Sequence, residues 1–317
     1  MKVWICAIAK MEELYIREWI EWHKQLGIDH IIIGDNNDSD YDKPLQPIIQ
    51  DYIDEGFVEV INVNNKQKIQ VKFYDNVYRE RKNEFDWIGF IDIDEFIELP
   101  AYNNDIHLFL SDNKFKDTDS IILPWLNYGD NEQLYYEDKP VKERFTNFTN
   151  QFYACDKSIK FAGIKFFIKS LNIIYSIESI HYPLNIRIET IYGTKYGGIK
   201  CCDSMGNFNY IPFKPNFHEN IYWVSDIIIN DNYYNNAYIA HYITKSTEEY
   251  IKFKCLRGVA DIPLFEDKSR YDEHYYFWIN KKNKNKIKMF EEYKETINKS
   301  VKEQLQRYKN SNGLLDE

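Results

Sequence analysis

The sequence lacks the features that mark membrane-spanning, secreted and disulfide-bonded proteins. No stretch approaches the roughly 20 apolar residues that a membrane-spanning helix needs. The amino-terminal apolar run is too short for a signal peptide, and charge rather than a cleavage site follows it. The five cysteines include no Cys-x-x-Cys pair and no Cys/His zinc spacing, which indicates reduced thiols. We therefore expect a cytoplasmic protein with at most peripheral contact with an inner membrane.

Basic charge is also scarce. Lysine and arginine number 40 against 50 acidic residues, which gives a net charge of -10 and a pI of about 5.3. Nucleic acid is not expected as a partner, because neutralising its phosphates needs a basic surface. Hydrophobic residues make up 44% of the chain and aromatic residues 17%, which is typical of a packed globule. No internal repeat or low-complexity linker is present among the 317 residues.

Residues 1–96 alternate between strand and helix patterns. Short apolar runs indicate buried strands, and stretches with helical spacing separate them. We predict strands at 3–9, 30–34, 58–63 and 87–93, and helices at 12–26, 45–55 and 68–81. Such alternation is typical of right-handed βαβ units, so we expect an α/β fold with a mostly parallel sheet and helices on both faces.

The last of these strands ends in three carboxylates, Asp92, Asp94 and Glu95. Ligands of parallel sheets bind beyond the carboxyl ends of the strands, and a solvated turn would not normally follow so apolar a strand. Asp92 and Asp94 are spaced so that both could face one hard cation, Mn²⁺ or Mg²⁺, bound by oxygen. We expect Glu95 to support the turn instead. The sequence therefore predicts a metal site at this strand end.

The pattern is less regular after residue 100. We expect a strand at 119–125, hairpin or mixed strands at 159–168 and 173–181, and a polar, loop-rich segment at 182–236. A helix is predicted at 244–255, because Ser246 and Glu249 have the spacing of a capping box. From residue 281 onward, apolar residues recur at steps of three and four, which predicts an amphipathic helix. This helix is expected to pack on the main domain, with a lipid-surface role as the alternative.

The order of several short motifs resembles GT-A-fold glycosyltransferases of the family 2 and family 92 type. The resemblance covers most of residues 3–260 and rests on AKMEE (9–13), LYIREWIEWH (14–23), LGIDH (26–30), DNNDSD (35–40), WIGFIDIDEF (87–96), WLNYG (125–129), ERF (143–145), KSIK (157–160), HYITKSTEEY (241–250) and RG (257–258). It implies a Rossmann-like GT-A domain at 1–260, with a nucleotide-sugar half at 1–100 and an acceptor half at 101–260. A helical extension would occupy 261–317.

The resemblance also implies a donor and a cation. The donor would be a nucleotide-diphospho-sugar, most simply a UDP-sugar, and Mn²⁺ or Mg²⁺ would neutralise its departing diphosphate. Asp94 would bind the cation directly, Asp92 would bind the ribose or the cation, and His241 would complete the coordination. Read alone, His241 would be a core residue.

Other positions would contact the rest of the donor. The resemblance places the base and ribose at the ends of the first two strands, with Lys10, Glu12 and Asp35 as candidate contacts; placement at a helix amino terminus is the alternative for Glu12. Positive charge near the diphosphate would come from Lys245 and from Lys157 or Lys160.

Inversion at the sugar requires a carboxylate that takes the proton of the acceptor hydroxyl. Asp130 and Glu143 are the two candidates, and the sequence does not choose between them. Asp130 stands where the family usually has glycine. Trp125 would stack on a sugar or pack in the core. The resemblance implies a hexosyl- or N-acetylhexosaminyltransferase acting on an oligosaccharide or lipid-linked glycan, in lipopolysaccharide or capsule synthesis.

Three other classes fit parts of the sequence. A haloacid-dehalogenase-like phosphatase would carry Thr or Val at the position of Phe96 and would have the acidic pair on its first strand. A nucleotidyltransferase would need a glycine-rich loop after the first strand, and residues 9–12 contain no glycine. A non-catalytic carbohydrate-binding protein would not need an acidic pair joined to a nucleotide-type half. The glycosyltransferase interpretation is therefore preferred.

Overall fold

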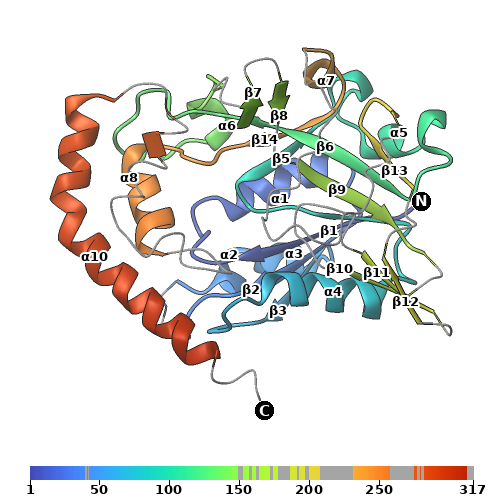
Figure 1. Cartoon of the computed structure of the whole chain (residues 1–317), viewed down its shortest axis with the longest axis horizontal. Coiled ribbons are helices and arrows are strands. Elements are labelled where there is room, and N and C mark those ends of the chain that lie inside the picture. Colours follow the sequence, from blue (N-terminus) through green and yellow to red (C-terminus); the bar gives the residue numbers. More distant parts are fainter. Residues whose placement is uncertain are drawn as a thin grey trace.

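A nine-stranded mixed sheet with helices on both sides forms the centre of the molecule (Figure 1). The structure is a computed structural model, and it describes residues 1–39, 41, 43–148, 153–156, 159–161, 164–171, 174–177, 186–190, 193–196, 200–207, 231–257, 275–276, 279 and 282–312. The predicted α/β class, with a mostly parallel sheet and a carboxyl-terminal helix, is confirmed.

The amino-terminal half contains the predicted βαβ units. Its strands are parallel and lie in the order β3-β2-β1-β4. The elements are β1 (Val3–Ala9), α1 (Ile16–Gln25), β2 (His30–Asp35), α2 (Leu45–Ile48), α3 (Gln50–Asp54), β3 (Val58–Asn62), α4 (Gln70–Arg81) and β4 (Trp87–Phe90). Helix 45–55 is thus two short helices, because the backbone leaves the helical region at Ile49, with φ -124° and ψ 20°. Gly27, two residues after the end of α1, has φ 92°, a left-handed conformation typical of the residue that follows a helix.

Alternate residues of β1 face two different hydrophobic clusters. Ile5 and Ala7 pack with Trp19 of α1, whereas Cys6 packs with Tyr74 of α4. Because successive side chains of a strand point to opposite faces, β1 is covered on both sides. This double burial explains why its sequence is apolar at every position.

The second half extends the same sheet in the order β4-β9-β6-β14-β5. Its strands are β5 (Glu95–Glu98), β6 (Ser120–Asn127), β9 (Ile164–Lys169), β13 (Cys201–Asp203) and β14 (Tyr238–His241), and β13 pairs with β6. In this register His241 lies opposite both Glu95 and Asn127. The acidic turn between β4 and β5 therefore lies next to the end of β14.

Smaller elements surround this sheet. Strands β7 (Tyr153–Asp156) and β8 (Ile159–Phe161) pair with each other, and β10 (Ile174–Ile177), β11 (Ile186–Thr190) and β12 (Gly193–Tyr196) form a three-stranded sheet. The helices are η1 (Pro100–Tyr102), α5 (Ile106–Leu110), η2 (Asn113–Phe115), α6 (Val141–Arg144) and α7 (Asp231–Asn236). The predicted loop-rich segment thus contains β11, β12, β13 and α7, and its residues 208–230 lie outside the described part.

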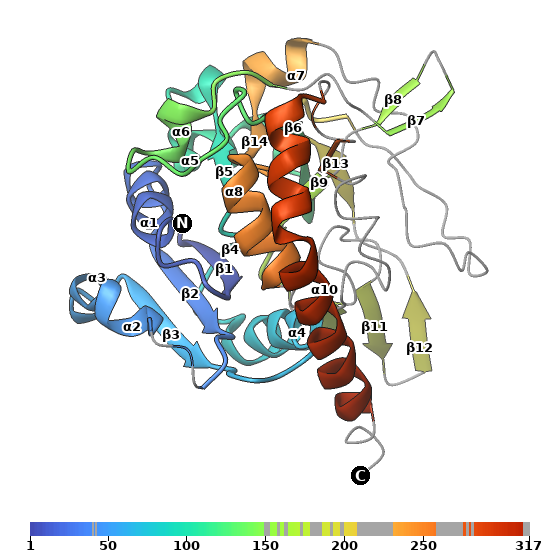
Figure 2. The same ribbon diagram turned by 90° about the vertical axis from the view of Figure 1, so that its left-hand side faces the viewer.

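The predicted helix at 244–255 is divided into α8 (Thr247–Tyr250) and a π-helix, η3 (Ile251–Leu256). The capping box is present, since Ser246 and Glu249 each accept a hydrogen bond from the other's backbone N–H. The long helix α10 (Lys284–Asn312) runs beside α8 in both views (Figures 1 and 2). Its buried face, which includes Phe290 and Ile297, packs against Tyr250 and Ile251. The prediction that it packs on the main domain is confirmed. Among the helices described, none combines the length and apolar character needed to span a membrane.

Candidate functional site

The acidic turn after β4 is held by Glu95. The Glu95 side chain is fully buried, and its Oε2 accepts a hydrogen bond of 2.9 Å from the backbone N–H of Asp92. A second bond of 3.1 Å runs from the Glu95 N–H to the Asp92 carbonyl. Burial raises the pKa of the Glu95 carboxyl well above its usual value. Glu95 thus supports the turn, as predicted.

Both carboxylate oxygens of Asp92 accept hydrogen bonds from protein side chains. Lys165 Nζ lies 2.8 Å from Oδ2, and Gln70 Nε2 lies 2.8 Å from Oδ1. Lys165 is fully buried and also lies 3.6 Å from Glu95 Oε2. Burial alone would lower the pKa of the Lys165 ammonium, but the charge of Asp92 and its hydrogen bond with Lys165 act against burial, and that pKa is raised. A fixed cation therefore already compensates the charge of Asp92.

Asp94 and His241 face each other at the ends of their strands. Asp94 Oδ1 lies 3.8 Å from His241 Nε2, and both residues are buried. His241 Nδ1 lies 3.0 Å from Asn127 Oδ1, so this nitrogen carries the proton and Nε2 keeps its lone pair. Burial lowers the pKa of His241 to about 4, which leaves the imidazole neutral near pH 7. The Trp125 ring packs on this imidazole, with the ring centroids 4.4 Å apart.

Two lysines lie beside this pair. Lys254 Nζ donates a hydrogen bond of 2.8 Å to Asp94 Oδ2. Lys245 is buried, has a left-handed backbone (φ 53°), and lies with its Nζ 4.3 Å from the centroid of the Tyr15 ring. Burial alone would raise the pKa of Asp94, but the positive charges of Lys254 and Lys245 hold it well below its usual value. Asp94 therefore stays ionised in a largely cationic environment.

The three candidate nucleotide contacts lie at the ends of β1 and β2, where Ala9 pairs with Asp35. Arg257 donates to the backbone carbonyl of Lys10 and forms an ion pair with Glu12. Glu12 Oε2 is buried and has no hydrogen-bond partner among the described residues. Burial raises the pKa of Asp35. Arg257, in the last motif of the resemblance, thus connects the first strand end to the carboxyl-terminal part of the chain.

The two candidate bases lie in different environments. Asp130 is buried, with Lys286 Nζ of α10 2.6 Å from its Oδ2 and a hydrogen bond from the Tyr275 hydroxyl. Glu143, in α6, is exposed. Lys286 and the Tyr275 hydroxyl both contact Asp130 Oδ2, so this arrangement suits a structural link to α10 better than it suits a base.

A buried ion pair joins three of the sequence motifs, and sequence reasoning missed it. Arg144 donates to both oxygens of Glu249, at 2.7 and 2.8 Å, and both side chains are 1% exposed. The Tyr15 hydroxyl donates to Glu249 Oε1 at 2.8 Å. The arginine inside ERF and the capping-box glutamate inside STEEY were the signals that could have indicated this pair.

Lys254 was also missed, and part of the predicted lysine set lies outside the described residues. Lys157 is not described, and Lys160 lies in β8 without a described side chain. Lys254 lies two residues after Lys252, which is exposed and pairs with Glu248. Both lysines lie in η3, but Lys254 faces Asp94 whereas Lys252 faces solvent and Glu248. No sequence pattern predicts a π-helix here, so the sequence did not show which of the two lysines would reach Asp94.

The side-chain atoms around Asp94 could provide some, but not all, of the ligands of a divalent cation. A histidine whose Nδ1 is held by a side-chain oxygen is oriented as metal-bound histidines are, with Nε2 toward Asp94. Bonds of about 2.1 Å from one cation to two ligands place those ligands roughly 3–4 Å apart, which agrees with the 3.8 Å between Asp94 Oδ1 and His241 Nε2. Within the described ranges no three His, Cys, Asp or Glu side chains form a metal-ligating group. Asp94 and His241 thus lie close enough for one cation to contact both, and Asp92 is not gathered with them.

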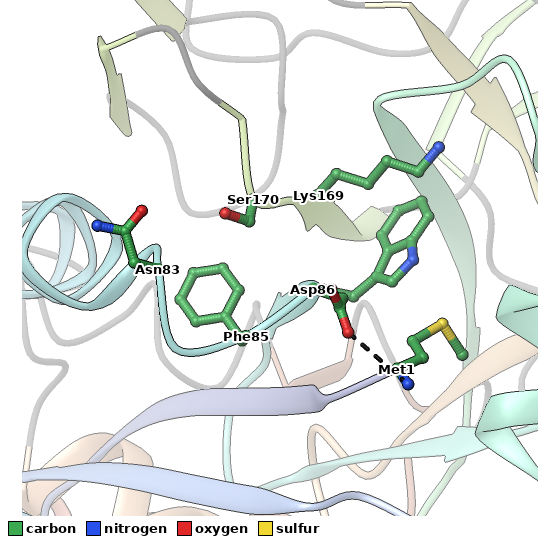
Figure 3. Close-up of a pocket in the computed structure, with 7 residues that line it drawn as sticks. Met1, Asn83, Phe85, Asp86, Lys169 and Ser170 are labelled. Carbon is green, nitrogen blue, oxygen red and sulfur yellow. Dashed lines mark ion pairs between the residues drawn. The ribbon is translucent and has the colours of Figure 1, made fainter.

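An open hollow lies at the amino ends of the parallel strands, opposite the end that carries the acidic turn (Figure 3). It is lined by residues at the amino ends of β1 and β4, where the Met1 amino group lies 3.8 Å from Asp86 Oδ2. Its other lining residues are Asn83, Phe85, Trp87, Lys169 and Ser170. None of the predicted site residues lines this hollow, so we assign it no part in the chemistry.

Solved glycosyltransferase structures match this chain only in part. S. aureus TarS solved in complex with UDP has a TM-score of 0.31 at 14% identity, over 40% of this chain and 36% of that one. The galactosyltransferase LgtC has a TM-score of 0.23 at 13% identity, over 53% and 58%. Scores this low support no conclusion about this chain's chemistry.

Sequence relatives are closer. A glycosyltransferase family 92 protein of Ricinus communis is 30% identical over 97 residues, which are 31% of this chain and 17% of that protein. One of Arabidopsis thaliana is 30% identical over 100 residues, which are 32% of this chain and 17% of that protein. The chain thus matches about a sixth of the length of these relatives. The sequence model of glycosyltransferase family 92 matches residues 5–220, more than half of the chain. This chain belongs to glycosyltransferase family 92.

Proposed function

We propose that the chain is a metal-dependent glycosyltransferase that moves a sugar from a nucleotide-diphospho-sugar, a UDP-sugar, to a glycan acceptor. The observation that carries this proposal is the Asp94–His241 pair, which lies at a sheet edge together with two lysines. Family membership supports the reaction class. The spacing of Asp94 and His241 suits one bound cation. The two lysines suit a donor that carries several negative charges.

Of the three predicted metal ligands, two suit the cation and the third suits the ribose. Asp94 and His241 would hold Mn²⁺ or Mg²⁺, which when bound would neutralise charge on the departing diphosphate. Asn127 fixes the His241 tautomer, so that Nε2 is available without a proton. Asp92, whose charge Lys165 compensates, suits the other predicted role, accepting hydrogen bonds from ribose hydroxyls.

The remaining cations and acceptors suit the donor's other groups. Lys245 and Lys254 would stabilise negative charge on the diphosphate, because both lie by Asp94 in a poorly solvated region. Glu12 offers a buried oxygen that could accept a hydrogen bond from a base N–H. Lys10 and Asp35 lie at the same strand ends as Glu12 and suit the ribose. Lys157 and Lys160 stay predictions.

The acceptor side is less defined. We propose an inverting transfer with Glu143 as the base, because Asp130 is bound to Lys286 while Glu143 is exposed. A surface-glycan acceptor, as in lipopolysaccharide or capsule synthesis, and a cytoplasmic location rest on the sequence resemblance alone. The same holds for the choice of hexose or N-acetylhexosamine.

The test is release of nucleoside diphosphate from a panel of nucleotide sugars. We expect turnover of a UDP-sugar that requires Mn²⁺ or Mg²⁺ and falls about 100-fold or more in Asp94→Asn. The matched control is Asp86→Asn, at the opposite sheet edge, which should keep the wild-type rate. Turnover that is unchanged in Asp94→Asn, or turnover of no nucleotide sugar at all, would overturn the proposal.

A further inference from the structure

We propose that Ser300 and Gln304 of α10 are positioning residues that hold η3 in the geometry that places Lys254 on Asp94. This inference rests on the proposed function, because it assigns Lys254 to the donor site. The carboxyl-terminal helix would then act on the reaction from outside the site. Figure 2 shows α10 running alongside α8, and η3 continues α8.

The last backbone carbonyls of η3 accept hydrogen bonds from a side chain of α10. The last carbonyls of any helix need partners from elsewhere, and a π-helical turn is rare because its packing is less favourable than that of an α-helix. Such a turn persists where neighbouring groups hold it. The last two carbonyls of η3 are those of Cys255 and Leu256.

Side chains of α10 supply these partners. Gln304 Nε2 donates to the carbonyls of Cys255 and Leu256, both at 3.1 Å. Ser300 Oγ donates to the Leu256 carbonyl at 2.6 Å and accepts from Gln304 Nε2 at 2.9 Å. Two residues one turn apart on α10 thus cap the end of η3 from a different helix.

Apolar contacts fix the two helices against each other. Ile297 and Val301 of α10 belong to the same buried cluster as Ile251 and Cys255 of η3. Because these side chains lie within a turn of Ser300, sliding along the helix axis would break packing and hydrogen bonds together. The cap therefore has a defined position.

The capped segment carries two cations that reach the donor site. Lys254 bonds Asp94, and Arg257, the residue after η3, bonds Glu12. One turn farther along α10, Arg307 Nη1 lies 2.7 Å from Asp38 Oδ2, and Asp38 also pairs with Lys10. Through these bonds α10 supports the segments that carry Lys254, Arg257 and, by way of Asp38, Lys10.

This convergence predicts a separable effect on the reaction. Releasing η3 should displace Lys254 and leave the Asp94–His241 pair in place. Turnover should fall about tenfold, because small displacements of a positioned group are costly in catalysis. The concentration of Mn²⁺ that gives half-maximal activity should not rise, because Asp94 and His241 keep their positions and a neighbouring positive charge leaves Asp94.

The experiment is a double-mutant cycle on the full chain. Gln304→Leu keeps the size of the side chain and removes its donors, and Lys302→Gln, an exposed neighbour, is the control. We expect Gln304→Leu to lower kcat about tenfold in the wild-type background and less than twofold in a Lys254→Met background. Equal losses in both backgrounds, or no loss in the wild-type background, would overturn the positioning role.

Hydrogen exchange makes the test independent of turnover. Amides of 251–257 should exchange faster in Gln304→Leu and at the wild-type rate in Lys302→Gln, with α4 unchanged in both. Exchange at the wild-type rate in Gln304→Leu would overturn the cap. If the wild-type protein turned over no nucleotide sugar, the proposed function would fail, and exchange alone would still decide whether α10 holds η3.

Discussion

Lys254 Nζ lies 2.8 Å from Asp94 Oδ2, although 160 residues separate them in the sequence. Asp94 follows a strand of the amino-terminal half, whereas Lys254 lies in a π-helix close to the carboxyl-terminal helix. Neither half alone contains both charges. The candidate site therefore forms only when both halves of the sheet have assembled and η3 has packed against α10.

Removing the Lys254 charge should weaken the donor's diphosphate site. We expect Lys254→Met to raise KM for the donor or lower kcat so that kcat/KM falls about tenfold, because one cation near the leaving group is lost. The control is Lys252→Met, whose side chain is 47% exposed and pairs with Glu248. Equal rates for the two variants would contradict the assignment of Lys254.

Asn127 should affect the affinity for the cation through His241, without contacting the sugar donor. Asn127→Leu removes the acceptor that fixes the His241 tautomer, and such partners typically change metal affinity 10- to 100-fold. We expect the Mn²⁺ concentration for half-maximal activity to rise by that factor, with the rate restored at high Mn²⁺. A Mn²⁺ titration that matches the wild type would show that His241 does not bind the cation.

The Arg144–Glu249 pair should be a main source of local stability. Glu249→Ala leaves a buried guanidinium without its partner, and removing one member of such a pair typically costs about 3–5 kcal/mol. Urea unfolding measures the change. The matched exposed pair is Glu137 with Lys139, where Glu137→Ala should change stability by no more than about 0.5 kcal/mol. A cost for Glu249→Ala as small as that would contradict the structure.

His23 should make stability depend on pH. Its Nδ1–H donates to the Trp19 carbonyl at 2.8 Å, and burial lowers its pKa to about 3. The unfolded chain, with a histidine pKa near 6.5, therefore takes up this proton first as pH falls. Stability is full above pH 6.5 and falls by up to about 1.4 kcal/mol per pH unit between 6.5 and 3.

The variant His23→Gln removes this titration. Its unfolding free energy, measured in urea at pH 7, 6 and 5, should decline less steeply with falling pH than that of the wild type. Parallel curves for the two proteins would mean that His23 is protonated in the folded state.

Local patterns predicted most of the first half of the fold. Apolar runs and helical spacing placed β1, β2, β3 and α4 within two residues of their ends, because each depends mainly on burial of neighbouring positions. The strand predicted at 87–93 was too long: β4 ends at Phe90, where the chain turns so that Asp92, Asp94 and Glu95 can be placed. β5 was missed because its partner, β14, lies some 140 residues later.

Site residues that stand in a short motif could be predicted from the sequence. Residues that join the site through a contact with a distant segment could not. Asp94 and His241 stand in recognisable motifs, and the structure brings them together. Lys254 depends on the rotation of a π-helix, which no periodicity reveals. The pairing of Asp130 with Lys286 depends on α10, far along the chain. Such contacts come from tertiary packing, which a single sequence does not encode locally.

The most direct test of the Asp94–His241 site is calorimetric titration of UDP into the wild-type protein and Asp94→Asn, with and without Mn²⁺. We predict that wild type binds UDP strongly only with Mn²⁺, that Asp94→Asn loses this metal-dependent binding, and that Asp86→Asn keeps it. UDP binding that is equally strong without metal, or unchanged in Asp94→Asn, would contradict the account.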